Sequence, residues 1–217
     1  MDFKEISTSE LSFLTEDTNT KIIDIRPVDA YNGWKLQNER RGGHIKGAKS
    51  LPAKWAEYMD WIEIVRSKEI LSENNIVIYG YDNSTIDKIA NLFNKAGYKN
   101  ISVYKKFIEE WTENENLPMD FLQRYEKLVP AEWVNNIIHS DKPFTYEGKK
   151  VVICHAHYRN RDAYLSGHIP GAIDMDTLAL EAPETWNRRS PDELKKALEE
   201  HGITHDTVVI LYGKFMF

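Results

Sequence analysis

The sequence predicts an α/β fold of two tandem domains, each a mostly parallel sheet flanked by helices. Short apolar runs rich in isoleucine and valine alternate with amphipathic segments of helical length, which is the order that parallel sheets with right-handed helical crossovers produce. The chain also repeats itself, because segments of its first half recur in the same order in its second half.

The repeat consists of four pairs of segments with matching order and similar spacing. The pairs are "KIIDIRPVDAY" at 21–31 and "KVVICHAHYRNRDAY" at 150–164, "GGHIKGAKSLP" at 42–52 and "SGHIPGAIDMD" at 166–176, "NNIVIYGYD" at 74–82 and "DTVVILYGKF" at 206–215, and, more loosely, "ISTSELSFL" at 6–14 and "LVPAEWVNNI" at 128–137. We therefore expect homologous domains at 1–122 and 123–217, joined inside 117–128.

Strands and a helix alternate in the first domain. The expected strands lie at 21–25, 76–80 and 100–105. A helix is expected at 84–98, because its apolar residues recur on one side at helical spacing: Ile86, Ile89, Ala90, Leu92, Phe93 and Ala96. Gly97 is expected to end it.

The run at 190–203 predicts a helix in the second domain, with signals at both ends. Ser190 is expected to cap it, with Pro191 at its first position and Glu193 completing a capping box. Gly202 is expected to end it.

Composition narrows the classes of function. Hydrophobic residues make up 41% of the chain, enough for a core, and the net charge of −6 argues against nucleic acid as the main partner. No apolar run approaches the roughly 18 residues of a membrane-spanning helix, and residues 1–21 lack the regions of a signal peptide. We expect no membrane partner, with a cytoplasmic chain as written, or a periplasmic one if an export signal was removed.

The repeated motifs resemble those of the rhodanese (thiosulfate sulfurtransferase) superfamily. The stretches that carry the resemblance are "DIRPVDAY" with "GGHIKGA", "AYLSGHIPGAIDMD" with the run up to "VVILYG", and "AGYKNISVYKKFIEEW". More narrowly, they resemble the first two domains of bacterial sulfurtransferases that carry three rhodanese domains. The resemblance implies transfer of a sulfane sulfur from a donor such as thiosulfate to an acceptor such as cyanide or a thiol, with no cofactor.

The resemblance also implies where a catalytic cysteine would lie. In family members the strand equivalent to 76–80 ends in a cysteine that opens a Cys-x-x-Gly-x-Arg loop, whose amides, arginine and following helix stabilise the thiolate and its persulfide. The corresponding positions here are Gly80, Tyr81, Asp82, Asn83, Ser84 and Thr85. A hydroxyl forms no persulfide, so we expect no catalytic residue, and we expect Asp82, Asn83 and Ser84 to cap the following helix instead.

In the second copy Gly213 takes the cysteine position, and Lys214, Phe215 and Met216 do not begin the family's loop. The sequence thus predicts an incomplete second domain that ends at the strand before the active-site loop. We expect the chain to be the N-terminal part of a longer protein, inactive by itself, whose partners are the remaining rhodanese domain and a sulfur-acceptor protein. The alternative is a binding or regulatory module built on degenerate rhodanese domains, with no sulfur transfer.

Cys154 is the single cysteine and offers an alternative nucleophile, because His155 and His157 follow it closely. It ends an apolar run and aligns with Asp24 rather than with the catalytic loop, so we expect a small buried side chain. We expect no metal site here, since on a strand His155 and His157 share one face while Cys154 points to the other.

Two pairs of charged residues are candidates for other roles. By resemblance to the family, Asp24 and Arg26 form a charge-assisted pair that orders the loop after the early strand. Arg188 and Arg189 precede the helix at 190–203 and are either an anion- or partner-binding patch or solvated charges beside a helix start.

The element Gly-His-Ile-x-Gly-Ala occurs once in each copy. Gly47 and Gly171 are expected to adopt a turn conformation that a side chain would hinder. His44 and His168 are either a base or ligand, or histidines that bond neighbouring backbone and fix a loop. No acidic or thiol residue accompanies both histidines, which favours the second interpretation.

Overall fold

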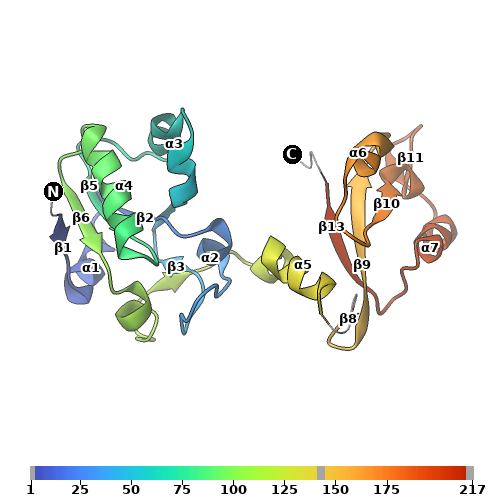
Figure 1. The fold of residues 1–217 in the computed structure, drawn as a ribbon, viewed down its shortest axis with the longest axis horizontal. Helices are drawn as coiled ribbons and strands as arrows, with labels where there is room; N and C mark the ends of the chain where they lie inside the picture. Colours follow the sequence, from blue (N-terminus) through green and yellow to red (C-terminus); the bar gives the residue numbers. More distant parts are fainter. Residues whose placement is uncertain (1–2, 141–144, 214–217) are drawn as a thin grey trace. The chain divides into compact units, whose positions relative to one another are not determined.

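The structure is a computed structural model that describes residues 3–140 and 145–213 and divides into two compact units, Met1–Val129 and Pro130–Phe217 (Figure 1). Each unit has its own sheet, and the predicted α/β fold with two domains is confirmed. Among the described residues, no helix combines the length and the apolar character needed to cross a membrane.

The boundary between the units lies after Val129, further along the chain than the expected position after residue 122. The intervening residues are bonded to the first unit. The N–H of Leu122 donates to the carbonyl of Asn32 at 2.8 Å, and the indole N–H of Trp34 donates to the carbonyl of Leu128 at 3.0 Å.

The first unit is built on a five-stranded parallel sheet with the order β1-β6-β5-β2-β4. Its strands are β1 (Lys4–Glu5), β2 (Thr20–Asp24), β4 (Lys49–Ser50), β5 (Asn75–Tyr79) and β6 (Ile101–Tyr104). A separate antiparallel pair joins β3 (His44–Ile45) to β7 (Met119–Asp120). Because parallel strands end at one edge, the loops that follow β2, β4 and β5 meet there.

Helical segments connect these strands and cover the sheet (Figure 1). They are α1 (Thr8–Leu14), α2 (Val28–Asn32), α3 (Trp61–Ser67), α4 (Asn83–Lys95), the 3₁₀ turns η1 (Ala53–Glu57) and η3 (Tyr125–Lys127), and the π-helical turn η2 (Phe107–Trp111). Helix α4 lies where a helix was expected, and it buries Ile86, Ile89, Ala90 and Phe93. Gly97 follows it with a left-handed φ of +99°.

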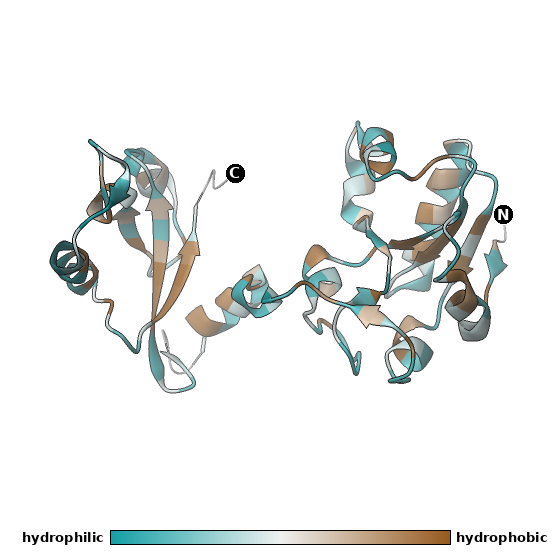
Figure 2. Ribbon diagram, turned by 180° about the vertical axis from the view of Figure 1, so that it is seen from behind, coloured by the Kyte–Doolittle hydropathy of each residue, from teal (hydrophilic) through white to brown (hydrophobic). Residues whose placement is uncertain are grey.

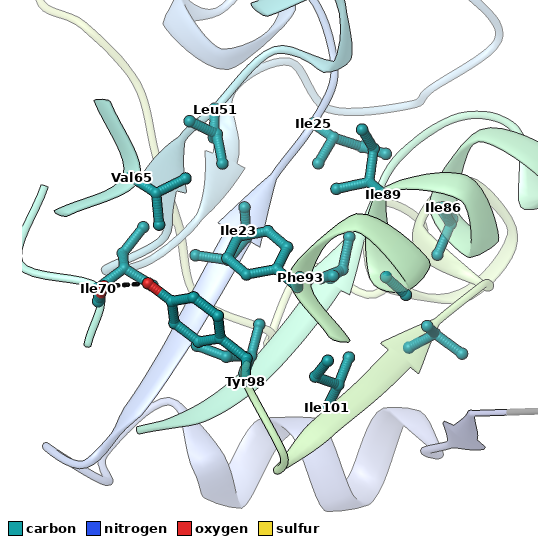
Figure 3. Packing of buried hydrophobic residues seen from close by; sticks show 14 of the residues in the cluster. Ile23, Ile25, Leu51, Val65, Ile70, Ile86, Ile89, Phe93, Tyr98 and Ile101 are labelled. Carbon is teal, nitrogen blue, oxygen red and sulfur yellow. Dashed lines mark hydrogen bonds between the residues drawn. The ribbon is translucent and has the colours of Figure 1, made fainter. Parts of the chain in front are cut away.

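Successive strand residues point to opposite faces of this sheet and enter two apolar clusters. Ile23 packs on the face covered by α3 and α4, together with Phe93 (Figure 3). Ile22 packs on the other face, with Leu11 of α1 and Trp111 of η2. Apolar colouring accordingly concentrates in the inner strands (Figure 2). Full burial of such a side chain stabilises the fold by about 1.5–3 kcal/mol.

The second unit has a smaller parallel sheet with the order β10-β9-β13, and β8 pairs with β9 in the antiparallel direction. The strands of this sheet and its antiparallel neighbour are β8 (Thr145–Tyr146), β9 (Lys149–His157), β10 (Ile173–Asp176) and β13 (Val208–Tyr212). A separate hairpin joins β11 (Glu181–Ala182) to β12 (Asn187–Arg188). The helical segments of this unit are α5 (Ala131–Ile138), α6 (Arg161–Ser166), η4 (Thr177–Ala179) and α7 (Pro191–Glu200).

Helix α7 confirms the predicted end signals. The hydroxyl of Ser190 accepts the N–H of Glu193 at 3.5 Å, and the carboxylate of Glu193 accepts the N–H of Ser190 at 3.0 Å. Pro191 is the first helical residue, and Gly202 follows the helix with a φ of +71°. These four residues fix both ends of the helix locally, which is why its position was predictable.

Candidate functional site

The carboxyl edge of the first sheet carries the bend at which the family places its catalytic loop. Gly80 leaves β5, and Asp82 caps α4 two residues later. The Oδ2 atom of Asp82 accepts the hydroxyl of Ser84 at 2.6 Å and the N–H and hydroxyl of Thr85 at 2.7 Å each. These bonds, that from Ser84 first, lower the pKa of Asp82 to about 2. A carboxylate therefore occupies the helix N-terminus that would otherwise stabilise an anionic donor or persulfide.

Gly80 has no space for the side chain that the chemistry requires. A Cβ atom added there would lie 2.7 Å from Cγ1 and 3.2 Å from Cδ1 of Ile25, and 3.5 Å from Cγ1 of Ile86. Ile25 is itself buried in the core, so it cannot move away without disturbing its own packing. The bend thus lacks both the thiol and the volume for one.

Asp24 and Arg26 form a fully buried ion pair beside this bend. The Nη2 atom of Arg26 lies 2.7 Å from Oδ2 of Asp24, and Nε donates to Oδ1 at 3.0 Å. Nη2 also donates to the carbonyl of Gly43 at 2.6 Å, and the guanidinium carbon lies 4.1 Å from the ring centroid of Phe107. Burial lowers the pKa of Arg26, but the Asp24 carboxylate together with Tyr79 and Tyr81 outweighs burial, and the net direction is upward. The pair joins the end of β2 to the loop before β3.

Glu39 is a further member of this network that sequence reasoning missed. It is buried and accepts the N–H groups of Leu36 and Gln37 at 3.2 and 2.8 Å, and its Oε1 lies 4.0 Å from Nη1 of Arg26. Tyr81, the first residue after the bend, donates its hydroxyl to the same carboxylate. Burial, and then this bond, raise the pKa of Tyr81. The loop at 32–42 therefore holds the loop that follows β5 in place.

A cavity of about 290 Å³ lies beside the bend. Its walls include Ile25, Pro27, Pro52, Tyr81 and Thr85. In the described part of the chain, no group of three or more His, Cys, Asp or Glu residues could hold a metal ion. What the edge presents is thus a hollow with Arg26, Lys54 and Asp82 among otherwise mostly apolar walls, and with no thiol.

The two Gly-His-Ile-x-Gly-Ala elements have the same geometry. His44 stacks on Tyr31 with ring centroids 3.6 Å apart, and His168 stacks on Tyr164 at 4.0 Å. Each Nδ1 also hydrogen-bonds the backbone carbonyl of the same tyrosine, at 2.7 and 3.0 Å. Burial lowers the pKa of His44. In both elements the arrangement suits a histidine that fixes a loop.

The glycine that follows each histidine adopts a left-handed backbone. Gly47 has a φ of +78° and Gly171 a φ of +77°. A Cβ atom at Gly47 would meet nothing within 4 Å, so the backbone conformation alone favours glycine there.

Strand register corrects one alignment made from the sequence. Tyr79 pairs with Asp24 across β5 and β2, and Tyr212 pairs with His155 across β13 and β9. His155 therefore occupies the position of Asp24, and the alignment of Cys154 with Asp24 is wrong by one residue. Two apolar residues precede Asp24 in the first copy and four precede His155 in the second, so the correspondence is set by strand register and not by distance from the preceding lysine.

The second unit has its own hydrogen-bonded histidine and carboxylate at this edge, which the misaligned sequences did not show. His157, at the position of Arg26, places Nε2 2.6 Å from Oδ1 of Asp174 on β10. Arg161 places Nε 2.9 Å from the other oxygen of Asp174. The carboxylate thus comes from the neighbouring strand rather than from the same strand as in the first unit.

Cys154 lies in the interior of the second unit. Its side chain is fully buried in an apolar cluster with Val152, Met175 and Ile203. Burial raises the pKa of its thiol, which disfavours the thiolate that nucleophilic attack requires. The surroundings of Cys154 are therefore those of a structural cysteine and not those of a reactive one.

The remaining sequence candidates lie apart from these networks. Gly213 follows β13 as Gly80 follows β5, and residues 214–217 lie outside the described residues. Arg189 is structural, since its Nε donates to the carbonyl of Leu178 at 3.0 Å and its Nη1 lies 3.5 Å from Glu193. Arg188 is exposed on β12.

Comparison with solved structures finds close relatives of the whole chain. A structure of an EanB variant in complex with ergothioneine has 59% sequence identity and a TM-score of 0.94, covering 99% of this chain and 50% of that one. A structure of the anaerobic ergothioneine biosynthesis enzyme from Chlorobium limicola, in complex with its natural substrate trimethyl histidine, has 58% identity and a TM-score of 0.94, covering 100% of this chain and 51% of that one.

Thiosulfate sulfurtransferase YnjE of Escherichia coli (strain K12) is 30% identical over 205 residues, which are 93% of this chain and 46% of that protein. The chain thus spans about half the length of these relatives. The profile of the rhodanese-like domain matches residues 7–114 and 130–216, one stretch in each unit. These matches confirm the resemblance drawn from the motifs, and the chain belongs to the rhodanese-like domain family.

Proposed function

We propose that this chain is the non-catalytic tandem-rhodanese part of a persulfide-dependent sulfurtransferase, whose reacting cysteine lies outside these 217 residues. The observation that carries the proposal is the packing at Gly80, where the family's cysteine position has no thiol and is filled by Ile25. Its partners would be a further rhodanese domain that carries the cysteine, and the sulfur acceptor.

Charge at the bend supports the same conclusion. In the family's reaction a thiolate attacks the sulfane sulfur of thiosulfate, sulfite leaves, and a persulfide remains on the cysteine. Each of these species is an anion that needs hydrogen-bond donors and positive charge. In the first unit Asp82 uses the donors at the start of α4, and Arg26 is paired with Asp24. The bend therefore offers no thiol, and its helix N-terminus and its arginine already hold carboxylates.

The relatives support a specific acceptor for the complete protein. EanB has been solved as a persulfide together with ergothioneine, and its persulfide cysteine lies outside the part that this chain matches. Identity to the ergothioneine-related structures is 58–59%, against 30% to the thiosulfate sulfurtransferase. We therefore favour trimethyl histidine over cyanide or a simple thiol as the acceptor of a complete protein built on this chain.

A turnover assay on the chain tests the non-catalytic assignment. The purified chain is incubated with thiosulfate and either cyanide or trimethyl histidine, and thiocyanate or ergothioneine is measured. We expect no product above that of the matched Cys154→Ser variant. Turnover that Cys154→Ser abolishes would overturn the assignment.

A binding or regulatory module without any sulfur transfer is the second candidate, favoured by the closed packing around Gly80. The two candidates differ in what the complete reading frame encodes. A Cys-x-x-Gly-x-Arg loop in a further domain, with ergothioneine formation that its Cys→Ser variant abolishes, supports the sulfurtransferase. A complete protein without such a loop supports the module.

A further inference from the structure

An exposed cluster of aromatic and arginine side chains lies beside the carboxyl edge of the second sheet. We call it the Trp186 surface and define it as Tyr158, Arg159, Trp186 and Arg188. Trp186 is 58% exposed and Tyr158 is 43% exposed, and their rings meet edge to face with centroids 5.3 Å apart. The guanidinium of Arg159 lies 5.3 Å from the ring centroid of Tyr158. Tyr158 and Arg159 follow β9, and Trp186 lies in the turn of the β11–β12 hairpin (Figure 1).

The backbone of this surface is held in an unfavourable conformation at two places. Arg159 has a φ of +49° and Trp186 a φ of +57°, in a region that costs side chains without Asn or Gly character of order 1–3 kcal/mol. Both residues are anchored by backbone bonds: Arg159 N–H donates to Asp176 at 3.1 Å, and Trp186 N–H donates to the carbonyl of Ala182 at 2.8 Å. The fold thus keeps this backbone strain at two residues whose side chains, a tryptophan and an arginine, are exposed to solvent.

The two arginines of this surface differ from their neighbours in lacking an ion pair. Among the described residues, Arg159 and Arg188 form no ion pair, whereas the neighbouring Arg161 and Arg189 do. Glu181 lies opposite Arg188 in the hairpin register, yet no ion pair joins them. The guanidinium group of Arg159 at the Tyr158 ring, and that of Arg188 two residues beyond Trp186, are therefore both available to a ligand.

We propose that the Trp186 surface binds an acidic segment of a partner protein. Arginine, tyrosine and tryptophan are the residues enriched where binding energy concentrates in protein interfaces. The planar guanidinium groups suit bidentate contacts with carboxylates, and the rings supply apolar area at low conformational cost. Single-stranded nucleic acid is the other ligand class that pairs arginine with aromatic stacking, and the test below distinguishes it from an acidic segment. The inference goes beyond the proposed function, because it requires no sulfur chemistry.

Fluorescence anisotropy of a fluorescein-labelled, glutamate-rich peptide with one phenylalanine tests this inference on the full chain. We expect saturable binding that weakens at higher salt, and a dissociation constant raised roughly tenfold by Trp186→Ala and about fivefold by Arg188→Ala. The controls are Phe13→Ala and Leu165→Ala, which remove side chains that are 82% and 64% exposed elsewhere. Both controls should bind as the parent chain does.

Arg159→Gly separates binding from folding. Glycine takes a positive φ without strain, so this variant should keep or raise the unfolding temperature while it weakens binding. Three results would overturn the inference. The first is no binding at millimolar peptide, and the second is binding by the Trp186→Ala and Arg188→Ala variants that equals binding by the parent chain. The third is that a single-stranded oligonucleotide binds more tightly than the peptide and that Trp186→Ala abolishes this binding. Because the readout is binding alone, none of them bears on the proposed function.

Discussion

Tyr79 lies directly opposite Asp24 across β5 and β2 and donates a hydrogen bond of 2.7 Å to its carboxylate. Tyr212 lies opposite His155 in the second unit, with its hydroxyl 3.2 Å from Nδ1. In both units the same hydroxyl accepts the backbone N–H of the isoleucine in the Gly-His-Ile element, at 3.1 and 2.9 Å. A tyrosine at the strand end therefore joins the sheet to this loop twice, once against a carboxylate and once against an imidazole.

Restoring the family's cysteine at Gly80 should destabilise the first unit. Gly80→Cys introduces a Cβ atom that overlaps Ile25, and such overpacking costs about 1–3 kcal/mol of unfolding free energy. Ile25→Ala alone should cost about 2–5 kcal/mol by leaving a cavity. The double variant should be more stable than the sum of the two effects implies, because each change relieves the other. Urea denaturation measures all three, and strict additivity would show that the two residues do not compete for space.

Removing Arg26 should be far more costly than removing an exposed arginine. Arg26→Met leaves Asp24 and Glu39 buried without their cation, which we expect to cost about 3–5 kcal/mol. Arg26→Lys should lie between, because an ammonium cannot bond Asp24 through two nitrogens. The matched control is Arg40→Met, which removes an exposed pair with Glu115 and should cost less than about 1 kcal/mol. Equal losses in chemical denaturation would contradict the role given to the buried pair.

Acidification should weaken the first unit through His44. Its pKa in the folded chain is lowered below the ordinary 6.5, with burial as the main cause. The unfolded chain therefore binds more protons than the folded chain in the window just below pH 6.5, so stability rises with pH through that window and is lost as pH falls. His44→Gln should flatten the dependence of the urea midpoint on pH between about 5 and 8. An unchanged slope would exclude His44 as its source.

Cys154 should react with thiol reagents only when the second unit opens. Its side chain is fully buried and its thiol pKa is raised by burial, so both access and thiolate population are low. Iodoacetamide should label the native chain slowly and the urea-unfolded chain quickly, as followed by intact mass. Native labelling as fast as that of the unfolded chain would contradict the buried position.

Features set by neighbouring residues were predictable from the sequence. The ends of α7 follow from Ser190, Glu193 and Gly202, and the apolar side of α4 follows from helical spacing alone. The repeat motifs predicted the family and the two domains, because each motif is a short stretch with its own turn glycine.

Features set by contacts distant in sequence were not predictable. Glu39 joins Tyr81 and Arg26 from a loop with no periodicity or motif, so nothing local marks it as a site residue. The match of His155 to Asp24 depended on strand register. An error of one residue in the alignment moves each side chain to the opposite face of the sheet. The boundary between the units lies after Val129, and not after residue 122, because Trp34 donates a hydrogen bond to Leu128, which is more than 90 positions away in the sequence.

This chain should form no persulfide, because its single cysteine, Cys154, is buried. Intact-mass spectrometry after incubation with thiosulfate tests it most directly, with the Cys154→Ser variant as control. The account predicts an unchanged mass for both proteins. A mass increase of one sulfur atom that a reductant removes, and that Cys154→Ser lacks, would contradict it.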